Sequence, residues 1–242
     1  MDWSKAKTIL IMALLFTNIF LIATYGFKGN DKNEIADEQT LLQVLENHDI
    51  YLETEIPRTH EDMPVLSIAY ADIDEEALDL AISQSKAVSA AKPTDAMYKR
   101  EADRLIERLG LSNDNVVLDG VRIKGRFVTV TYSCEADGVP VDGCYMKCVF
   151  KDGEIESFEY SRIKPVSVSK GKQSTISAAV ALMKFMNEVE TDEKIYIQDI
   201  AMVYWVDEES FEVQEAVADV AFPFWKISYN DGQVKHIEAY EQ

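Results

Sequence analysis

Histidines, cysteines and clustered carboxylates are the residues of this 242-residue chain whose types could do chemistry. Its three histidines, His48, His60 and His236, stand far apart, and no cysteine or carboxylate lies beside them at metal-ligand spacing. We therefore expect no catalytic metal and no cofactor. Each histidine is predicted to lie on the surface or to cap a helix.

The motifs that activate a nucleophile or bind phosphate are also missing. The sequence contains no Gly-x-Ser-x-Gly and no phosphate-binding glycine loop. Acidic runs at 72–76 and 207–209 lack the full ligand series of a calcium loop and are predicted to be solvated turns. The chain is not predicted to be an enzyme.

Three cysteines, Cys134, Cys144 and Cys148, fall within fifteen residues. They are too few for a disulfide scaffold and too irregular for a four-ligand zinc site. Cys134 and Cys144 flank a turn-rich segment, and a hairpin centred near Val139 would place them roughly opposite each other. Two interpretations stay open: one disulfide bridge, or free thiols buried in strands.

The charge balance excludes one class of partner. Lys plus Arg number 24 against 43 Asp plus Glu, a formal charge of −19. A nucleic-acid backbone would be repelled, so nucleic-acid binding is excluded. The 47% hydrophobic content is that of a folded protein.

An N-terminal apolar run predicts a membrane anchor. Residues 8–27 (TILIMALLFTNIFLIATYGF) are twenty consecutive uncharged residues, which match a hydrocarbon core of ~30 Å at ~1.5 Å per residue. The alternative, a cleaved signal peptide, usually has only ~7 to 15 apolar residues before small residues at the cut. We expect an uncleaved, single-pass transmembrane helix in the cell membrane.

The orientation of this helix is argued from length. Lys5 and Lys7 before the span are balanced by Lys28 and Lys32 after it, so basic residues do not decide. The short tail before residue 8 is easily kept in the cytoplasm while the large domain is translocated. We predict a cytoplasmic N-terminus and an extracytoplasmic ectodomain.

Four segments are predicted: tail and anchor (1–27), tether (28–36), a first α+β module (37–165) and a second (166–242). Asp37 is expected to cap a helix, and a strand is expected at 65–71. Asp74 should open another helix.

From Thr94 a helix followed by strands occurs twice, which indicates α+β modules with a helix packed across an antiparallel sheet. The first helix ends at Gly110, and a shift of 79 residues then sets Asp152-Gly153 on Asp231-Gly232, as an internal repeat would. The predicted strands cover 116–123, 127–132, 145–150, 155–160, 195–206, 217–229 and 234–239. The second helix, from Ser174, is predicted to bury Ile176, Ala179, Val180, Met183 and Met186.

Aromatic residues gather near the C-terminus, including Trp205 and the run Phe222-Pro223-Phe224-Trp225. The core of a small sheet is the expected place for them. The alternatives are an edge strand open to a partner, or the lining of a peptide groove.

The opening Met1-Asp-Trp-Ser-Lys-Ala-Lys-Thr-Ile9, a single span containing Asn18 and an acidic α+β ectodomain together resemble the YycI (WalI) family. The segment from Gly138-Val-Pro-Val141 through Asp152-Gly153 looks like the hairpins of YycI, of its companion YycH and of PepSY-type modules. Phe224-Trp225-Lys226-Ile227 is similar to their closing strand. The cysteines and the unusually acidic ectodomain depart from the family pattern.

The resemblance implies a Gram-positive membrane protein whose ectodomain consists of two PepSY-like helix-plus-sheet units. It implies a protein that acts without catalysis by binding the sensor histidine kinase (YycG/WalK-like) of a two-component system that controls cell-wall metabolism, together with a YycH-like protein. In that family the transmembrane helix is thought to contact the kinase helices. The sign of the regulation does not follow from the sequence.

Within the span, an amide such as Asn18 is costly in hydrocarbon unless it finds a partner on another helix. We predict that the contacting face comprises Leu14, Thr17, Asn18 and Leu21, which recur at helical spacing. The alternative for Asn18 is that it is tolerated in a helix that only tethers. The alternative function is an anchored PepSY-like module that binds or inhibits a cell-wall hydrolase or protease through its aromatic C-terminal unit.

Overall fold

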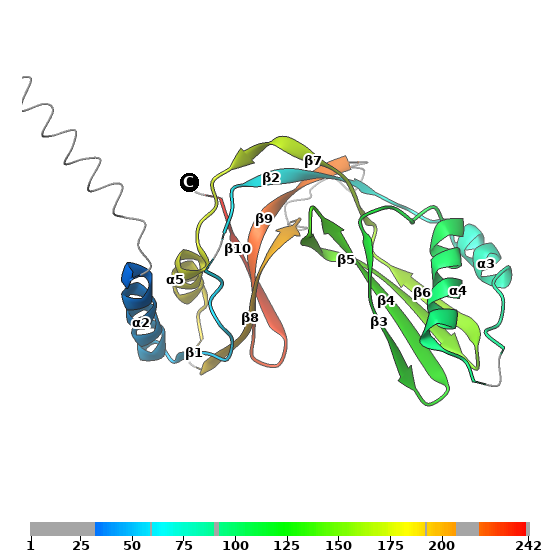
Figure 1. Ribbon diagram of the computed structural model, residues 1–242, viewed down its shortest axis with the longest axis horizontal. Helices are drawn as coiled ribbons and strands as arrows, with labels where there is room; N and C mark the ends of the chain where they lie inside the picture. Colours follow the sequence, from blue (N-terminus) through cyan, green and yellow to red (C-terminus); the bar gives the residue numbers. More distant parts are fainter. Residues whose placement is uncertain (1–31, 59, 90–91, 192, 207–217, 241–242) are drawn as a thin grey trace, which may run out of the picture. The chain divides into compact units, whose positions relative to one another are not determined.

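The computed structural model describes residues 32–58, 60–89, 92–191, 193–206 and 218–240 (Figure 1). The chain divides into two compact units, Met1–Tyr51 and Leu52–Gln242. The architecture is α+β with a mostly sheet core.

The first unit contains α2 (Lys32–Asn47), and β1 (Ile50–Leu52) crosses the boundary between the units. Because α2 begins at Lys32, Asp37 lies inside the helix, and its predicted role as the cap is wrong. Residues 32–36 contain no Gly or Pro. The polar composition that favoured a tether there does not break a helix.

The second unit is built on antiparallel strands. Its strands are β2 (Met63–Tyr70), β3 (Val116–Lys124), β4 (Phe127–Ala136), β5 (Val139–Lys151), β6 (Glu154–Tyr160), β7 (Ile163–Gln173), β8 (Ile195–Trp205), β9 (Ala218–Tyr229) and β10 (Gln233–Glu238). They follow the order β3-β4-β5-β8-β9-β2-β7, with β6 beside β5 and β10 beside β9. Two antiparallel meanders result, β3 to β6 and β8 to β10, and β5 pairs with β8 in parallel at Val141 and Tyr204.

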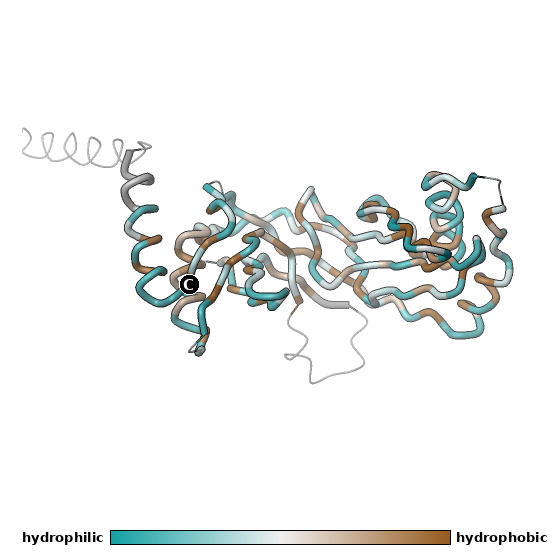
Figure 2. The backbone as a smooth tube through the Cα atoms, turned by 90° about the horizontal axis from the view of Figure 1, so that it is seen from below, coloured by the Kyte–Doolittle hydropathy of each residue, from teal (hydrophilic) through white to brown (hydrophobic). Residues whose placement is uncertain are grey.

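One face of the first meander is covered by α4 (Asp95–Arg108), with α3 (Glu75–Ser83) beside it. Side chains alternate between buried and partly exposed along β4. Hydrophilic and hydrophobic stretches are mixed along the backbone in Figure 2. The buried side chains of α4 meet those of β4, β5 and β6 in one apolar cluster. It includes Tyr98, Ala102, Leu105, Ile106, Val128, Val130, Tyr132, Met146, Cys148, Phe150 and Phe158.

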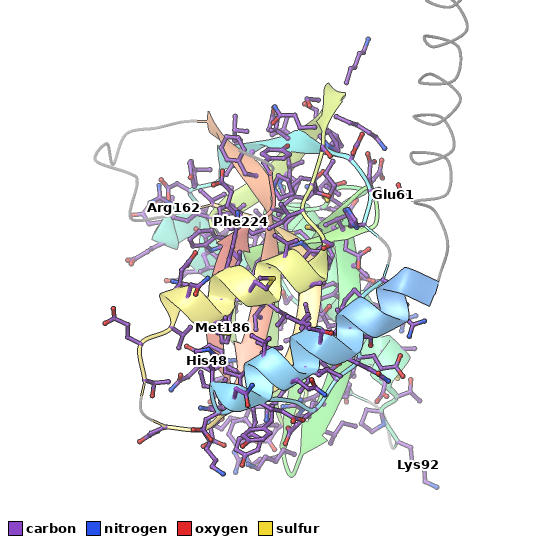
Figure 3. All side chains as sticks on the ribbon, turned by 90° about the vertical axis from the view of Figure 1, so that its left-hand side faces the viewer. His48, Glu61, Lys92, Arg162, Met186 and Phe224 are labelled. Atoms are coloured by element: carbon purple, nitrogen blue, oxygen red, sulfur yellow. A yellow bond between two sulfur atoms is a disulfide. The ribbon has the colours of Figure 1, made fainter. Side chains whose placement is uncertain are left out.

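The second meander carries α5 (Ala178–Glu188), which crosses its strands in Figure 3. The helix starts later than expected because the Ser177 side chain accepts the Val180 N–H and so forms the N-cap. Its buried side chains are those of Ala178, Ala181, Leu182 and Phe185. Ile176 is buried, as predicted, although it precedes the helix, and Ala179 and Met186 are half-buried. Val180 and Met183 are exposed, so this part of the predicted buried face is wrong. Because the helix is apolar on nearly all sides, hydrophobic periodicity alone does not determine which of its faces packs against the sheet.

The aromatic run of β9 lies in the sheet interior, between β8 on one side and β2 and β10 on the other, so the edge-strand alternative is wrong. Trp225 is buried and its Nε1–H donates to the Ile176 carbonyl at 2.9 Å. Pro223 has no N–H to donate, and it stands where the β2 partner ends at Ala221 and the β10 partner begins at Phe224.

Strand β7 was not expected. It begins at Ile163, contains the predicted module boundary at 165/166, and pairs with β2 along almost its full length. Pro165, Gly171 and three lysines gave this segment the composition of a linker. The ladder to β2 holds it as a strand.

Candidate functional site

The predicted contacting face, Leu14, Thr17, Asn18 and Leu21, lies outside the described residues. Among the helices that the structure describes, none combines the length and apolar character of a membrane span. In the same described ranges no group of three or more His, Cys, Asp or Glu side chains is placed to hold a metal ion. The site that the structure builds lies instead where the two meanders of the second unit meet.

A disulfide joins Cys134 of β4 to Cys144 of β5, with the two Cα atoms 5.5 Å apart. Of the two interpretations left open by the sequence, the bridge is therefore the one the structure contains. Cys148 is a buried free thiol, and burial, helped by the charge of Glu101, raises its pKa to about 12.

The bridge lies at a large bulge in β5. Ser133 lies opposite Tyr145, but Glu135 lies opposite Pro140, so residues 141–144 face Cys134 alone. The hairpin turn itself lies at Asp137-Gly138, both with positive φ, rather than near Val139. Because the bulge adds residues to β5 only, the two cysteines face each other although the turn is not midway between them. The bulge also brings Val141 beside Tyr204 of β8.

Asp142 projects from this bulge to the second meander. Its Oδ1 accepts a hydrogen bond from Lys226 Nζ of β9 at 2.5 Å, and its Oδ2 lies 2.6 Å from His236 Nε2 of β10. The prediction that His236 lies on the surface or caps a helix is therefore wrong. His48 and His60 are exposed, as predicted.

Aromatic rings enclose the histidine. Trp205 of β8 stacks on the His236 ring with centroids 4.3 Å apart, and Phe224 meets Trp205 edge-on at 4.9 Å. We call Asp142, Trp205, Phe224, Lys226 and His236 the junction cluster.

Electrostatics define what the junction cluster does. Burial alone would raise the pKa of Asp142, but the hydrogen bonds and charges of His236 and Lys226 outweigh it and hold the pKa at about 2. Such a carboxylate stays ionised near neutral pH and is a poor proton acceptor. It acts as an ionic link between the first meander's bulge and two strands of the second.

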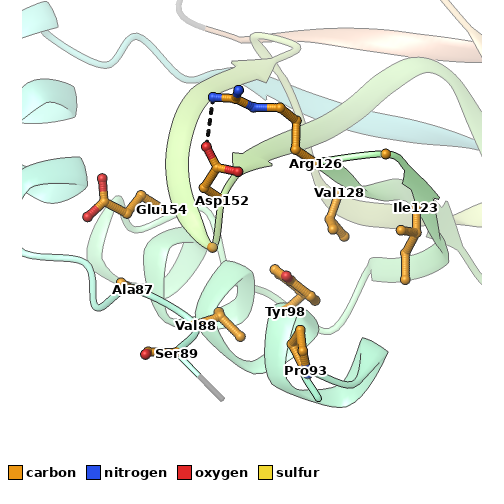
Figure 4. Close-up of a pocket in the computed structure, with 12 residues that line it drawn as sticks. Ala87, Val88, Ser89, Pro93, Tyr98, Ile123, Arg126, Val128, Asp152 and Glu154 are labelled. Atoms are coloured by element: carbon orange, nitrogen blue, oxygen red, sulfur yellow. Dashed lines mark ion pairs between the residues drawn. The ribbon is translucent and has the colours of Figure 1, made fainter. Parts of the chain in front are cut away.

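A pocket of about 570 Å³ lies at the other end of the first meander (Figure 4). Its walls come from the loop before α4, from the start of α4 and from the turns of the β3–β4 and β5–β6 hairpins. The lining residues are Ala87, Val88, Ser89, Pro93, Tyr98, Ile123, Gly125, Arg126, Val128, Asp152, Gly153 and Glu154.

Backbone contacts fix the loop that forms one wall. The Val88 N–H donates to the Gly153 carbonyl at 2.8 Å, and a Cβ on Gly153 would lie only 2.5 Å from the Val88 oxygen. The Lys86 N–H donates to Oε1 of Glu101, a buried carboxylate on α4, at 2.9 Å.

Arginines on the same helix compensate the charge of that carboxylate. Arg104 and Arg108 pair with Glu101 at 2.9 and 3.3 Å. Burial acts to raise the pKa of Glu101, but the Lys86 N–H and the two arginines together lower it. Arg108 also donates to the Ala81 carbonyl and to Ser85, which ties the end of α3 to this network.

Neither the junction cluster nor the pocket could be predicted from the sequence, and the reason is the same for both. Asp142 and His236 are 94 residues apart, and Tyr98 lies far along the chain from both hairpin turns that share its pocket. The one available signal was the position of Asp142 between Pro140 and Gly143, in a segment already identified as turn-rich. In comparisons with known proteins, no family model and no curated sequence matches this chain.

Proposed function

We propose that this protein is a non-catalytic, single-pass membrane protein that regulates a sensor histidine kinase of a YycFG (WalKR)-like two-component system controlling cell-wall metabolism. In this proposal the cytoplasmic tail and the helix at 8–27 anchor it, and the rest is extracytoplasmic. Its partners are the kinase and a YycH-like protein. The sequence motif that supports this is the Met1–Ile9 opening that leads directly into the apolar run.

The Cys134–Cys144 disulfide is the structural observation that supports an extracytoplasmic location for the domain. Stable disulfides form in oxidising compartments and are rare in the cytosol. A bridged domain that follows an uncharged run of membrane-spanning length supports translocation of the domain.

The PepSY-like interpretation is supported by the two similar halves of the second unit. In each, one helix, α4 or α5, precedes an antiparallel meander whose last two strands join at an Asp-Gly turn. Both turns have a glycine with φ close to +90°. This is the arrangement expected for two helix-plus-sheet units.

A regulator of this kind biases a kinase by binding its two signalling states unequally. A difference of ~1.4 kcal/mol in binding free energy changes the ratio of the states about tenfold. We place the contact that makes this difference on Leu14, Thr17, Asn18 and Leu21, with the ectodomain as its modulator.

The test is site-specific photocrosslinking in intact membranes from position 18, with position 16 as the matched control. These positions face opposite sides of a helix. The proposal expects a sensor-kinase adduct from position 18 and a much weaker one from position 16. Equal adducts, or lipid adducts alone, would contradict it.

The alternative function is addressed by a second set of crosslinkers placed on the ectodomain. If the ectodomain is crosslinked to a cell-wall hydrolase or protease while position 18 gives only lipid adducts, the helix is only a tether. Since β9 lies inside the sheet, the alternative has lost the free edge on which it partly depended.

A further inference from the structure

The disulfide and the junction cluster meet in one short stretch of β5. Strand β5 pairs with β4 through Pro140 and again from Tyr145 onward, and residues 141–144 between these two ladders have no register partner on β4. Cys144 ends this stretch, and its bridge to Cys134 ties the stretch covalently back to β4. The bridge therefore limits where the bulge can lie relative to the first meander.

The same stretch carries the acidic member of the junction cluster. Asp142 lies two residues before Cys144, and its carboxylate accepts from Lys226 at 2.5 Å and lies 2.6 Å from Nε2 of His236. Gly143, between Asp142 and the bridge, has a φ of +79°, a conformation that other residues rarely adopt. The direction in which Asp142 points therefore depends on a turn whose far end is fixed by the disulfide.

Two tryptophans of the second meander can report on this contact. The Trp205 ring stacks on that of His236 with the planes only 6° from parallel, so a displacement of the imidazole changes the surroundings of the indole. Trp225 is buried and donates to the Ile176 carbonyl. Because neighbouring residues of a strand point to opposite faces, Trp225 lies on the other face of β9 from Lys226. It serves as an internal control for Trp205.

We propose that the Cys134–Cys144 disulfide is a redox-controlled clamp on the contact between the two meanders. In the oxidised protein the bridge holds the bulge so that Asp142 reaches Lys226 and His236. Reduction of the bridge frees the end of the bulge and loosens this link. The inference concerns the second unit alone and does not depend on the proposed regulatory function.

The reductant is a dithiol, which supplies two electrons and two protons. One of its thiolates attacks a sulfur of the bridge and forms a mixed disulfide, while the other cysteine leaves as a thiolate and takes up a proton. The second thiol of the reductant then displaces the remaining cysteine, which gives two protein thiols and an oxidised, disulfide-bonded reductant. Cys134 and Cys144 are only 2% and 5% exposed, so the exchange requires local opening of the hairpin and the clamp changes state slowly.

The test uses the full chain in lipid nanodiscs, labelled with 5-fluorotryptophan and followed by fluorine NMR. The three tryptophans, Trp3, Trp205 and Trp225, give three resonances, which single tryptophan-to-phenylalanine variants assign. Reduction with dithiothreitol is expected to shift the Trp205 resonance and to leave that of Trp225 in place. The variant C134A/C144A should show the shifted Trp205 resonance without reductant and should not respond to dithiothreitol.

Asp142→Asn distinguishes a clamp that acts through this carboxylate from a general loosening. It should shift the Trp205 resonance in the oxidised protein, and reduction should then add no further shift. Asp152→Asn is the matched control, because it breaks an exposed ion pair at the β5–β6 turn and should leave both the Trp205 resonance and its response to reduction unchanged.

Three results would overturn the proposal. The first is a Trp205 resonance that reduction does not move. The second is a shift on reduction that is as large in Asp142→Asn as in the wild type, because the bridge would then not act through Asp142. The third is a simultaneous loss of the Trp205 and Trp225 resonances, which would show that reduction unfolds the whole unit instead of opening one contact.

Discussion

The Asp142 carboxylate lies 2.6 Å from Nε2 of His236, a residue 94 positions further along the chain. With the Lys226 contact at 2.5 Å, one side chain on a bulge links the first meander to two strands of the second. The loss of this carboxylate should therefore weaken the whole unit rather than one hairpin.

Asp142→Asn is expected to lower the free energy of unfolding by about 1–3 kcal/mol, because Lys226 and His236 stay partly buried without their counter-ion. Urea denaturation of the full chain, followed by tryptophan fluorescence, measures this change. The matched control is Asp152→Asn, which breaks the exposed pair with Arg126 and should cost less than about 1 kcal/mol. Equal losses for both variants would mean that the junction cluster is not a special link.

The lowered pKa of Asp142 predicts a pH dependence. Its pKa is about 2 in the folded protein against 3.8 for the unperturbed group, so folding favours the ionised carboxylate. The stabilisation is complete above pH ~4 and is lost as the pH falls toward 2, and a shift of this size corresponds to about 2 kcal/mol. The difference in stability between the wild type and Asp142→Asn should therefore shrink between pH 5 and pH 2. A constant difference across this window would rule out the ion pairs as its source.

The strands and most helices could be predicted from the sequence because their signals are local. Alternating residues in β4, the Asp-Gly turn at 152–153 and the stop of α4 at Gly110 each depend on neighbours in the chain. Strand β7 could not, since its composition resembles a linker and only its ladder to β2 makes it a strand. The buried face of α5 could not be predicted either, because tertiary packing selects among its apolar faces.

The sites were less predictable than the fold. Hairpin spacing placed Cys134 near Cys144 and allowed a bridge, but the bulge that aligns them comes from the pairing of β5 with two different strands. The pairing of Asp142 with His236 depends on three strands meeting, and no spacing in the sequence encodes it.

Removal of the disulfide tests its contribution to stability. The bridge closes a short loop between Cys134 and Cys144, for which chain entropy predicts about 3 kcal/mol. The variant C134A/C144A should lose about 2–3 kcal/mol, and a reductant should destabilise the wild type but not the variant. If the reductant acts equally on both, the bridge is absent from the protein as expressed.

Alkylation with iodoacetamide, read out by intact mass, gives a separate prediction for the cysteines. Burial and the raised pKa of about 12 should protect Cys148 in the native protein at pH 8. Unfolding without a reductant should expose this one thiol, and unfolding with a reductant should expose all three. Three labels without a reductant would contradict the bridge.

The two Asp-Gly turns allow the wall of the pocket to be tested by comparison. Gly153 and Gly232 have φ of +90° and +92°, so an alanine strains the backbone equally at both positions. A Cβ at Gly232 meets no atom within 4 Å, whereas at Gly153 it would lie 2.5 Å from the Val88 oxygen. Gly232→Ala should therefore cost about 1 kcal/mol.

Gly153→Ala should cost roughly 1–2 kcal/mol more than Gly232→Ala, because the Val88 backbone must move and its hydrogen bond to residue 153 is weakened. Thermal unfolding of both variants measures the difference. Equal stability of the two variants would show that the loop at 86–89 moves freely and does not form a fixed wall.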